Sequence, residues 1–230
     1  MDGQSRRKID MGMRALEFSR AHPDSEPGAP NVVARLEQLV TRANAAATAQ
    51  RDGLIQVHAA SVRRKQLRRE MLAGPIAHLA QVGRAAAREQ HELGNAFRFK
   101  PGADTILAFR TAARSMAGAA QEHREVLLKY GLSQSVLDEF IQQLDELDAT
   151  IALGYEGRAG HVGASRELRD VSSQIVGSVR VMHGRNRQRF AEDGQLFGSW
   201  LNVSRVSRTP RPDTKPEDER PGGGEVRPAA

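Results

Sequence analysis

The fold of this chain is decided by residues 135–182, SVLDEFIQQLDELDATIALGYEGRAGHVGASRELRDVSSQIVGSVRVM. Apolar side chains recur there every three or four residues, the spacing of one face of an α-helix. No proline interrupts residues 102–209. Because proline removes a backbone donor and clashes with the preceding turn, its absence favours a long, unbroken helix. The apolar positions are Leu137, Phe140, Ile141, Leu144, Leu147, Ile151, Val162, Leu168, Val171, Ile175, Val179 and Met182.

A second stretch, residues 31–93, has the same rhythm. We expect its helix to break or kink at Gly74 and Pro75, then to continue to a left-handed cap at Gly94. Two long helices in one chain predict an antiparallel hairpin or bundle. The positions predicted to face its core include Val32, Leu36, Leu39, Val40, Ala43, Ala47, Leu54, Val57, His58, Ser61 and Val62.

Further helices are expected around the linker between these stretches. Residues 104–130 predict one helix, with Asp104 as its N-cap and Gly131 as its end. Ser135 begins a possible capping box for the last helix. These signals place short connections between long elements.

The sequence divides into three parts. Residues 1–30 hold a short amphipathic helix and a proline-containing linker, and residues 31–206 form the helical bundle. Residues 207–230 are rich in proline and glycine and predict a disordered tail. The predicted fold class is therefore all-α: an elongated antiparallel bundle of long helices with coiled-coil character, followed by a disordered C-terminal tail.

Composition narrows the class of protein. The 230 residues include no cysteine, which excludes a disulfide framework and a thiolate metal site. No run approaches the roughly 18 uncharged apolar residues of a membrane-spanning helix. The first residues lead into no apolar segment, so no secretory signal is expected. We expect a cytoplasmic protein without a membrane segment.

Charge is distributed unevenly along the chain, whose formal net charge is +6. Residues 31–131 carry 16 basic and 8 acidic side chains, whereas residues 132–160 carry one basic and six acidic ones. Antiparallel helices of one bundle would use this asymmetry to fix their pairing. The alternative is a surface for nucleic acid.

Two basic clusters are the candidates for such a surface. If the helices that carry them were antiparallel neighbours, the clusters could merge and bind phosphates without sequence preference. The predicted nucleic-acid-binding residues are Arg63, Arg64, Lys65, Arg68 and Arg69 in one cluster and Arg185, Arg187 and Arg189 in the other.

Glycines recur every third residue within the long helical pattern. Each costs a helix about 1 kcal/mol relative to alanine, so some other contact should offset the loss. The stretch is interpreted as a stripe where another helix packs closely, as a hinge, or as a loop that clamps phosphate. Its residues are Gly154, Gly157, Gly160 and Gly163, and Gly74 and Pro75 form the second predicted hinge.

Catalytic motifs are not found. No glutamate precedes a histidine by three residues, as paired metal sites in bundles require, and His91-Glu92 lacks the second histidine of a zinc-protease helix. No phosphate-binding glycine loop or nucleophile elbow occurs. We therefore predict no catalytic residue, metal or cofactor. One remote alternative is a HEPN-like helical RNase, because Arg51 precedes His58 by a spacing used in that family.

Three segments carry a family resemblance: Ala108–Arg114, His161–Ser165 and Val181–Arg187. With the surrounding residues, from about 50 to 205, they resemble all-helical hypothetical proteins of GC-rich bacteria, a group without an assigned activity. The resemblance implies a bacterial origin and a helical fold.

Taken together, these patterns favour a helical interaction or scaffold protein without catalytic activity. Its partner is expected to be another protein or a second copy of the chain. Sequence-nonspecific binding of nucleic acid is the alternative function.

Overall fold

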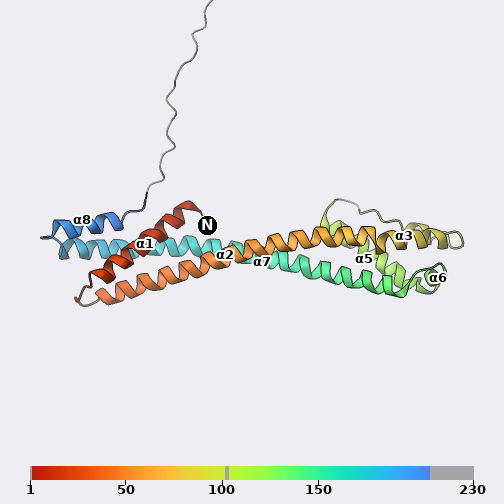
Figure 1. The fold of residues 1–230 in the computed structure, drawn as a ribbon, viewed down its shortest axis with the longest axis horizontal. Coiled ribbons are helices and arrows are strands. Elements are labelled where there is room, and N and C mark those ends of the chain that lie inside the picture. Colours follow the sequence, from red (N-terminus) through yellow and green to blue (C-terminus); the bar gives the residue numbers. More distant parts are fainter. Residues whose placement is uncertain (1, 102–103, 208–230) are drawn as a thin grey trace, which may run out of the picture.

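The chain folds into a long rod built on two helices that run its whole length (Figure 1). The computed structural model describes residues 2–101 and 104–207. Helix α2 (Ala29–Ala73) contains 45 residues, and helix α7 (Gln134–Arg189) contains 56. Figure 1 shows the two helices crossing near the middle of the rod, so that each lies above the other at one end.

Contacts between the long helices show that they are antiparallel. Arg42 of α2 pairs with Glu167 of α7, whereas Arg63, further along α2, pairs with the earlier Glu146. The prediction of an all-α, elongated antiparallel fold is confirmed, and the described residues contain no strand.

Two shorter helices thicken one end of the rod. Helices α1 (Gly3–Ala21) and α8 (Gly194–Val203) pack there beside the long pair. The N-terminal segment is thus part of the bundle. The buried core at this end consists of Ile9, Met11, Ala15, Leu16, Phe18, Leu36, Leu39, Val40, Ala43, Ala46, Leu168, Val171, Ile175, Val179, Met182, Phe190 and Trp200.

Four helices thicken the other end. They are α3 (Pro75–Ala86), α4 (Leu93–Ala96), α5 (Ile106–Glu122) and α6 (Arg124–Lys129). Their apolar faces close a second core over the ends of α2 and α7. The main side chains of that core are Leu67, Met71, Ile76, Leu79, Val82, Leu93, Phe97, Phe109, Met116, Leu127, Leu132, Leu137, Phe140, Leu144 and Leu147.

The helix that follows Gly74 and Pro75 ends earlier than predicted. Gly74 separates α2 from α3, but α3 stops at Ala86, and Gly94 lies within α4 instead of forming a left-handed cap. Beyond α4 the chain buries Phe97 against Gly83, where an added Cβ would lie 2.3 Å from the phenylalanine Cβ. Burial of the Phe97 ring against Gly83 therefore holds the segment after α4 against α3.

Residues 104–130 form two helices where the sequence predicted one. Thr105, and not Asp104, caps α5, because its hydroxyl accepts a hydrogen bond from the Ala108 amide. Asp104 instead pairs with Arg68 of α2. The predicted end at Gly131 is observed, with φ at +94°, a conformation that favours glycine.

The predicted disordered tail, residues 207–230, lies outside the described residues except for Ser207 at its start.

None of the described helices combines the length and the apolar character needed to cross a bilayer.

Ion pairs join the basic half of the chain to the acidic start of α7. Arg110 and Arg114 of α5 both bind Asp148, and Arg114 also reaches Asp145. Arg63 of α2 forms a two-pronged pair with Glu146. The basic side chains of residues 31–131 thus pair with the acidic side chains of residues 132–160 within the bundle.

The Asp148 carboxylate makes the bundle sensitive to acid. Its pKa is lowered from the ordinary value, first by the hydrogen bond from Arg110 and then by Arg114. A lowered folded-state pKa contributes stability above the ordinary aspartate pKa, and that stability is lost as the pH falls through the folded value. We expect Asp148→Asn to lower the urea midpoint at pH 7 and to lower it by less at about pH 3, where part of the contribution of the carboxylate is lost. The exposed Asp52, changed to asparagine, is the control and should shift neither midpoint. A constant deficit of the Asp148 variant at both pH values would contradict the linkage.

Candidate interaction surface

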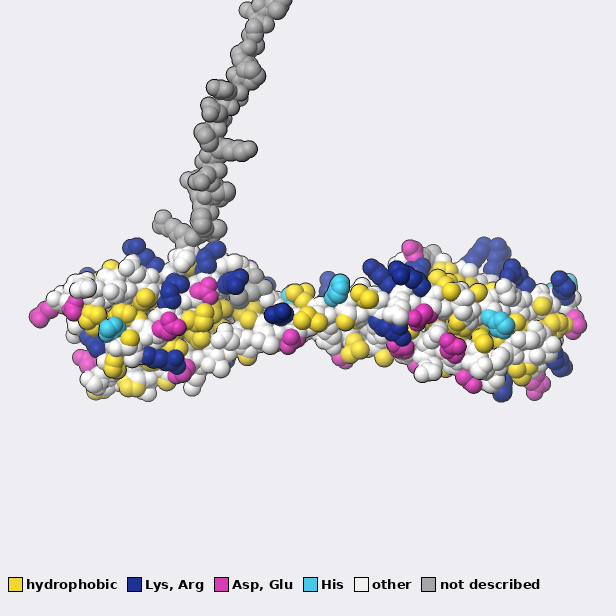
Figure 2. All heavy atoms as spheres, viewed as in Figure 1, with side chains coloured by type: hydrophobic (Ala, Val, Ile, Leu, Met, Phe, Trp, Pro, Cys, Tyr) yellow, Lys and Arg dark blue, Asp and Glu magenta, His cyan; other side chains and the backbone are white. Residues whose placement is uncertain are grey.

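The middle of the rod, which we call the waist, is only two helices thick. It comprises residues 47–62 of α2 and 149–165 of α7. Neither core extends across the waist. On α7 the buried residues of one core end at Leu147, and those of the other core begin at Leu168. Figure 2 shows the rod narrowing there, with hydrophobic side chains at its surface. Two paired helices without a third cannot cover all of their apolar side chains.

Two glycines set the spacing of the helices at the waist. A Cβ added at Gly53 would lie 2.7 Å from the Gly157 carbonyl oxygen and 2.8 Å from the His161 amide nitrogen. One added at Gly157 would lie 3.0 Å from the Gly53 oxygen. The backbones touch here because neither residue has a side chain.

The other glycines of the predicted stripe differ in their surroundings. Gly154 faces the Arg64 guanidinium, whose Nη1 would lie 2.6 Å from an added Cβ. Gly160 and Gly163 have open space where a Cβ would be. Helix α7 continues through all four positions, so the stretch is neither a loop nor a break in the helix.

A small polar network links the two helices beside the glycine contact. The Gln50 side chain is buried and donates from Nε2 to Ser165 Oγ at 2.7 Å. The Gln50 carbonyl oxygen lies 3.1 Å from His161 Nδ1. Ser165 Oγ in turn donates to the His161 carbonyl oxygen at 2.8 Å. Because Gln50 is joined to both Ser165 and His161, these contacts fix which residues of α2 and α7 face each other.

One face of the waist carries large exposed apolar side chains and has no covering helix. Leu54 is 52% exposed, Tyr155 is 71% exposed and Val162 is 55% exposed. Beside them Ile151 is partly buried against the core that includes α5. We call these four residues the bare face.

Seven-residue spacing relates the bare face to covered parts of α7. Residues seven apart lie on nearly the same side of a helix, with a drift of about 20°. Seven residues before Tyr155 lies Asp148, which binds α5. Seven after Val162 lies Arg169, close to the start of α1: the pKa of Asp2 is lowered mainly by hydrogen bonds from Ser5 and also by the Arg169 charge. The bare face therefore continues the side that α5 partly covers and leads toward the start of α1.

The same relation holds on α2. Leu54 lies midway between Val40, buried in the core that α1 completes, and Arg68, which pairs with Asp104 just before α5. The Arg68 guanidinium also stands 5.4 Å from the centre of the Phe109 ring in α5. The stripe of α2 is thus buried at Val40, partly covered at Arg68 and exposed at Leu54. On α7, Asp148 is half-buried, whereas Tyr155, Val162 and Arg169 are exposed.

The predicted basic clusters do not merge. Arg63 lies opposite Glu146, whereas Arg185 lies 39 residues further along α7, which corresponds to about 60 Å of helix. Arg63 and Arg68 are held by Glu146 and Asp104. Arg64 of the first cluster is half-buried, and Lys65, Arg69 and Arg187 are exposed.

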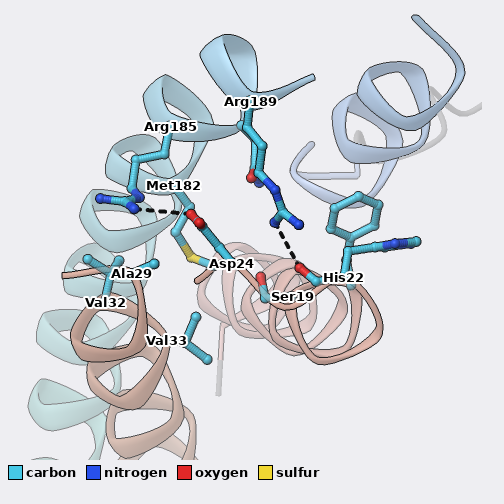
Figure 3. Close-up of a pocket in the computed structure, with 11 residues that line it drawn as sticks. Ser19, His22, Asp24, Ala29, Val32, Val33, Met182, Arg185 and Arg189 are labelled. Carbon is cyan, nitrogen blue, oxygen red and sulfur yellow. Dashed lines mark hydrogen bonds and ion pairs between the residues drawn. The ribbon is translucent and has the colours of Figure 1, made fainter. Parts of the chain in front are cut away.

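The second cluster holds the connection between α1 and α2 in place. Arg189 donates to the His22 carbonyl oxygen at 2.9 Å, and Arg185 donates to Asp24 at 3.1 Å (Figure 3). Arg189 also donates to the Pro23 carbonyl oxygen at 2.7 Å. The cavity beneath these contacts is about 30 Å³, space for one water molecule. Arg185 and Arg189 therefore have a structural role in this end of the rod.

The histidine and arginine of the RNase alternative do not form a site. His58 was predicted to lie in the core or the helix seam, but its side chain is exposed, as is that of Arg51. The two residues lie on one helix, and no described pocket is lined by them. Within the described ranges, no group of three histidine, aspartate or glutamate side chains is placed to hold a metal ion.

Comparison with known proteins adds no relative: no protein-family model, curated protein or solved structure matches the chain.

From the apolar rhythm, most of the bare face was expected in the core. Leu54, Ile151 and Val162 fit that rhythm, yet Leu54 and Val162 are more than half exposed and Ile151 is only partly buried. Another feature of the sequence distinguishes them. The 33 waist residues hold only four charged side chains, about half the density of the chain as a whole: Arg51, Asp52, Glu156 and Arg158. A helix pair poor in charge at a place without a third helix indicates a surface for a partner.

Proposed function

We propose that this protein is a non-catalytic helical scaffold that binds a protein partner through the bare face of its waist. The observation that carries the proposal is the exposure of Leu54, Tyr155 and Val162 on a side of the hairpin that α5 partly covers at one end and that is buried at Val40 toward the other. Contiguous exposed apolar side chains mark interaction sites more often than chance surface. A tyrosine at the centre of the face suits binding, since tyrosine is enriched among the residues that dominate interfaces.

The rod also suits a scaffold by its shape. The two cores are separate and lie at opposite ends, and the close contact of Gly53 with Gly157 holds the thin middle together. A partner bound at the waist would lie between two independently packed ends. Each end could keep its structure whether or not the waist is occupied.

A capture experiment with matched variants tests this function. The full chain is immobilised and exposed to a lysate of the organism that carries the gene, beside Tyr155→Glu and Val181→Glu. Val181 is 55% exposed on α7, 16 residues beyond the last residue of the waist. We expect a protein retained by the wild type and by Val181→Glu, with at least a tenfold loss in Tyr155→Glu. Two results would contradict the proposal: equal retention of the protein by both variants, or no protein retained even by the wild type. Circular dichroism of each variant checks that it is folded.

A further inference from the structure

The bare face is a gap in a layer of third helices. Asp148, which binds α5, and Arg169, beside the start of α1, are 21 residues apart on α7. At 1.5 Å per residue, the two levels are about 30 Å apart. A helix of up to about 20 residues would fill that length and complete a three-helix arrangement along the rod.

Both neighbouring helices begin at the edges of this gap. The N-terminus of the chain and the first residues of α1 lie beside the waist in Figure 1. Along α5, Arg110 contacts Asp148 while Arg114 also reaches the earlier Asp145, so α5 runs away from the waist. The first turns of both helices therefore lie at the edges of the gap, where Asp2 caps α1 and Thr105 caps α5.

Basic side chains flank the apolar middle of the gap. Arg51, His58 and Lys65 follow one another at seven-residue spacing on α2, next to the stripe of Leu54, and Arg158 lies seven residues after Ile151 on α7. All four are exposed. Four stripes of residues at seven-residue spacing form this side of the waist, and none contains an aspartate or glutamate. On α2 they are residues 47, 54 and 61 and residues 51, 58 and 65; on α7 they are residues 151, 158 and 165 and residues 155 and 162.

We infer that the bare face binds an amphipathic helix of another protein, with its apolar stripe on Leu54, Tyr155 and Val162 and acidic side chains toward Arg51 and Arg158. This inference rests on the proposed function and specifies the partner. A second copy of the chain suits the face less well, because its own bare face would bring a second set of basic side chains. The uncharged middle formed by Leu54, Tyr155 and Val162 is likewise unsuited to the sugar-phosphate backbone of a nucleic acid.

A pair of designed peptides tests the inference. Both have 18 residues and leucine at helical spacing; one carries glutamates at the flanking positions and the other carries lysines. Binding of each fluorescein-labelled peptide to the full chain is followed by fluorescence anisotropy. We expect the acidic peptide to bind at least about tenfold more tightly than the basic one. The double variant Arg51→Glu, Arg158→Glu should reverse this order, and Val181→Glu should leave it unchanged.

Three outcomes would overturn the inference: equal affinity for both peptides, no binding of the acidic peptide, or its displacement by single-stranded DNA in the wild type. Sedimentation velocity of the chain alone adds a fourth, a dimer that Tyr155→Glu converts to monomer, because the occupant would then be a second copy. If one of these is found while the Tyr155-dependent capture of a protein persists, the proposed function stands and only the identity of the helix is wrong. If the capture fails as well, both are wrong.

Discussion

Replacing Trp200 by alanine is expected to lower the free energy of unfolding by about 4 kcal/mol and to release α8 from the rod. The side chain is fully buried, its ring lies 5.5 Å from that of Phe18, and its Nε1 donates to His183 Nδ1 at 3.2 Å. Truncation leaves a cavity between α1, α7 and α8 and removes the main anchor of a ten-residue helix. Urea unfolding followed by circular dichroism measures the loss.

Trp200→Phe is the matched control, because it keeps an aromatic ring in the site and removes the indole hydrogen bond. We expect it to cost about 1 to 1.5 kcal/mol. Proteolysis gives a second readout: cleavage within residues 191–203 should accelerate in Trp200→Ala well before the rest of the chain unfolds. Unchanged stability in the alanine variant would show that α8 does not depend on this side chain.

Replacing Gly53 by alanine is expected to destabilise the protein by about 2 kcal/mol, although alanine is the better helix former. The new methyl group would overlap the backbone of α7 at the Gly157 oxygen and the His161 nitrogen. Backbone atoms cannot rotate aside as a side-chain end can, so the two helices must separate. Separation also weakens the contact of Gln50 with Ser165.

Gly160→Ala should have the opposite effect. The position is helical with open space around it, so the substitution should raise the free energy of unfolding by about 0.5 to 1 kcal/mol. Both variants are compared by urea unfolding under the same conditions. A Gly53→Ala protein as stable as Gly160→Ala would mean that the helices are further apart at the waist than the structure shows.

Local sequence predicted the long helices well, for a physical reason. A helix that packs on one side needs apolar residues at three- and four-residue spacing, and Phe140, Leu144, Leu168 and Ile175 follow that rule and are buried. Helix ends were predicted less well. Asp104 was expected to cap α5, but a distant arginine, Arg68, binds it and Thr105 becomes the cap.

The helix α8 was not predicted. Its stretch, residues 194–203, is short and contains Gly194 and Gly198, so local preferences for a helix are weak. Burial of Trp200 against α1 and α7 supplies the missing free energy, and that contact joins parts of the chain nearly 200 residues apart. Similarly, no local pattern indicates that Arg189 fastens the α1–α2 connection.

By itself the sequence determined that the protein is helical, that its two longest helices pair antiparallel and that basic and acidic segments meet, because these follow from local periodicity and from charge order along the chain. Only the tertiary structure decided which apolar stripes are covered. Leu54 and Val40 occupy the same stripe of α2, yet one is exposed and the other buried, because α1 packs over one level of the hairpin and no helix packs over the other. Periodicity specifies the direction in which a side chain points; burial depends on what the rest of the chain places there.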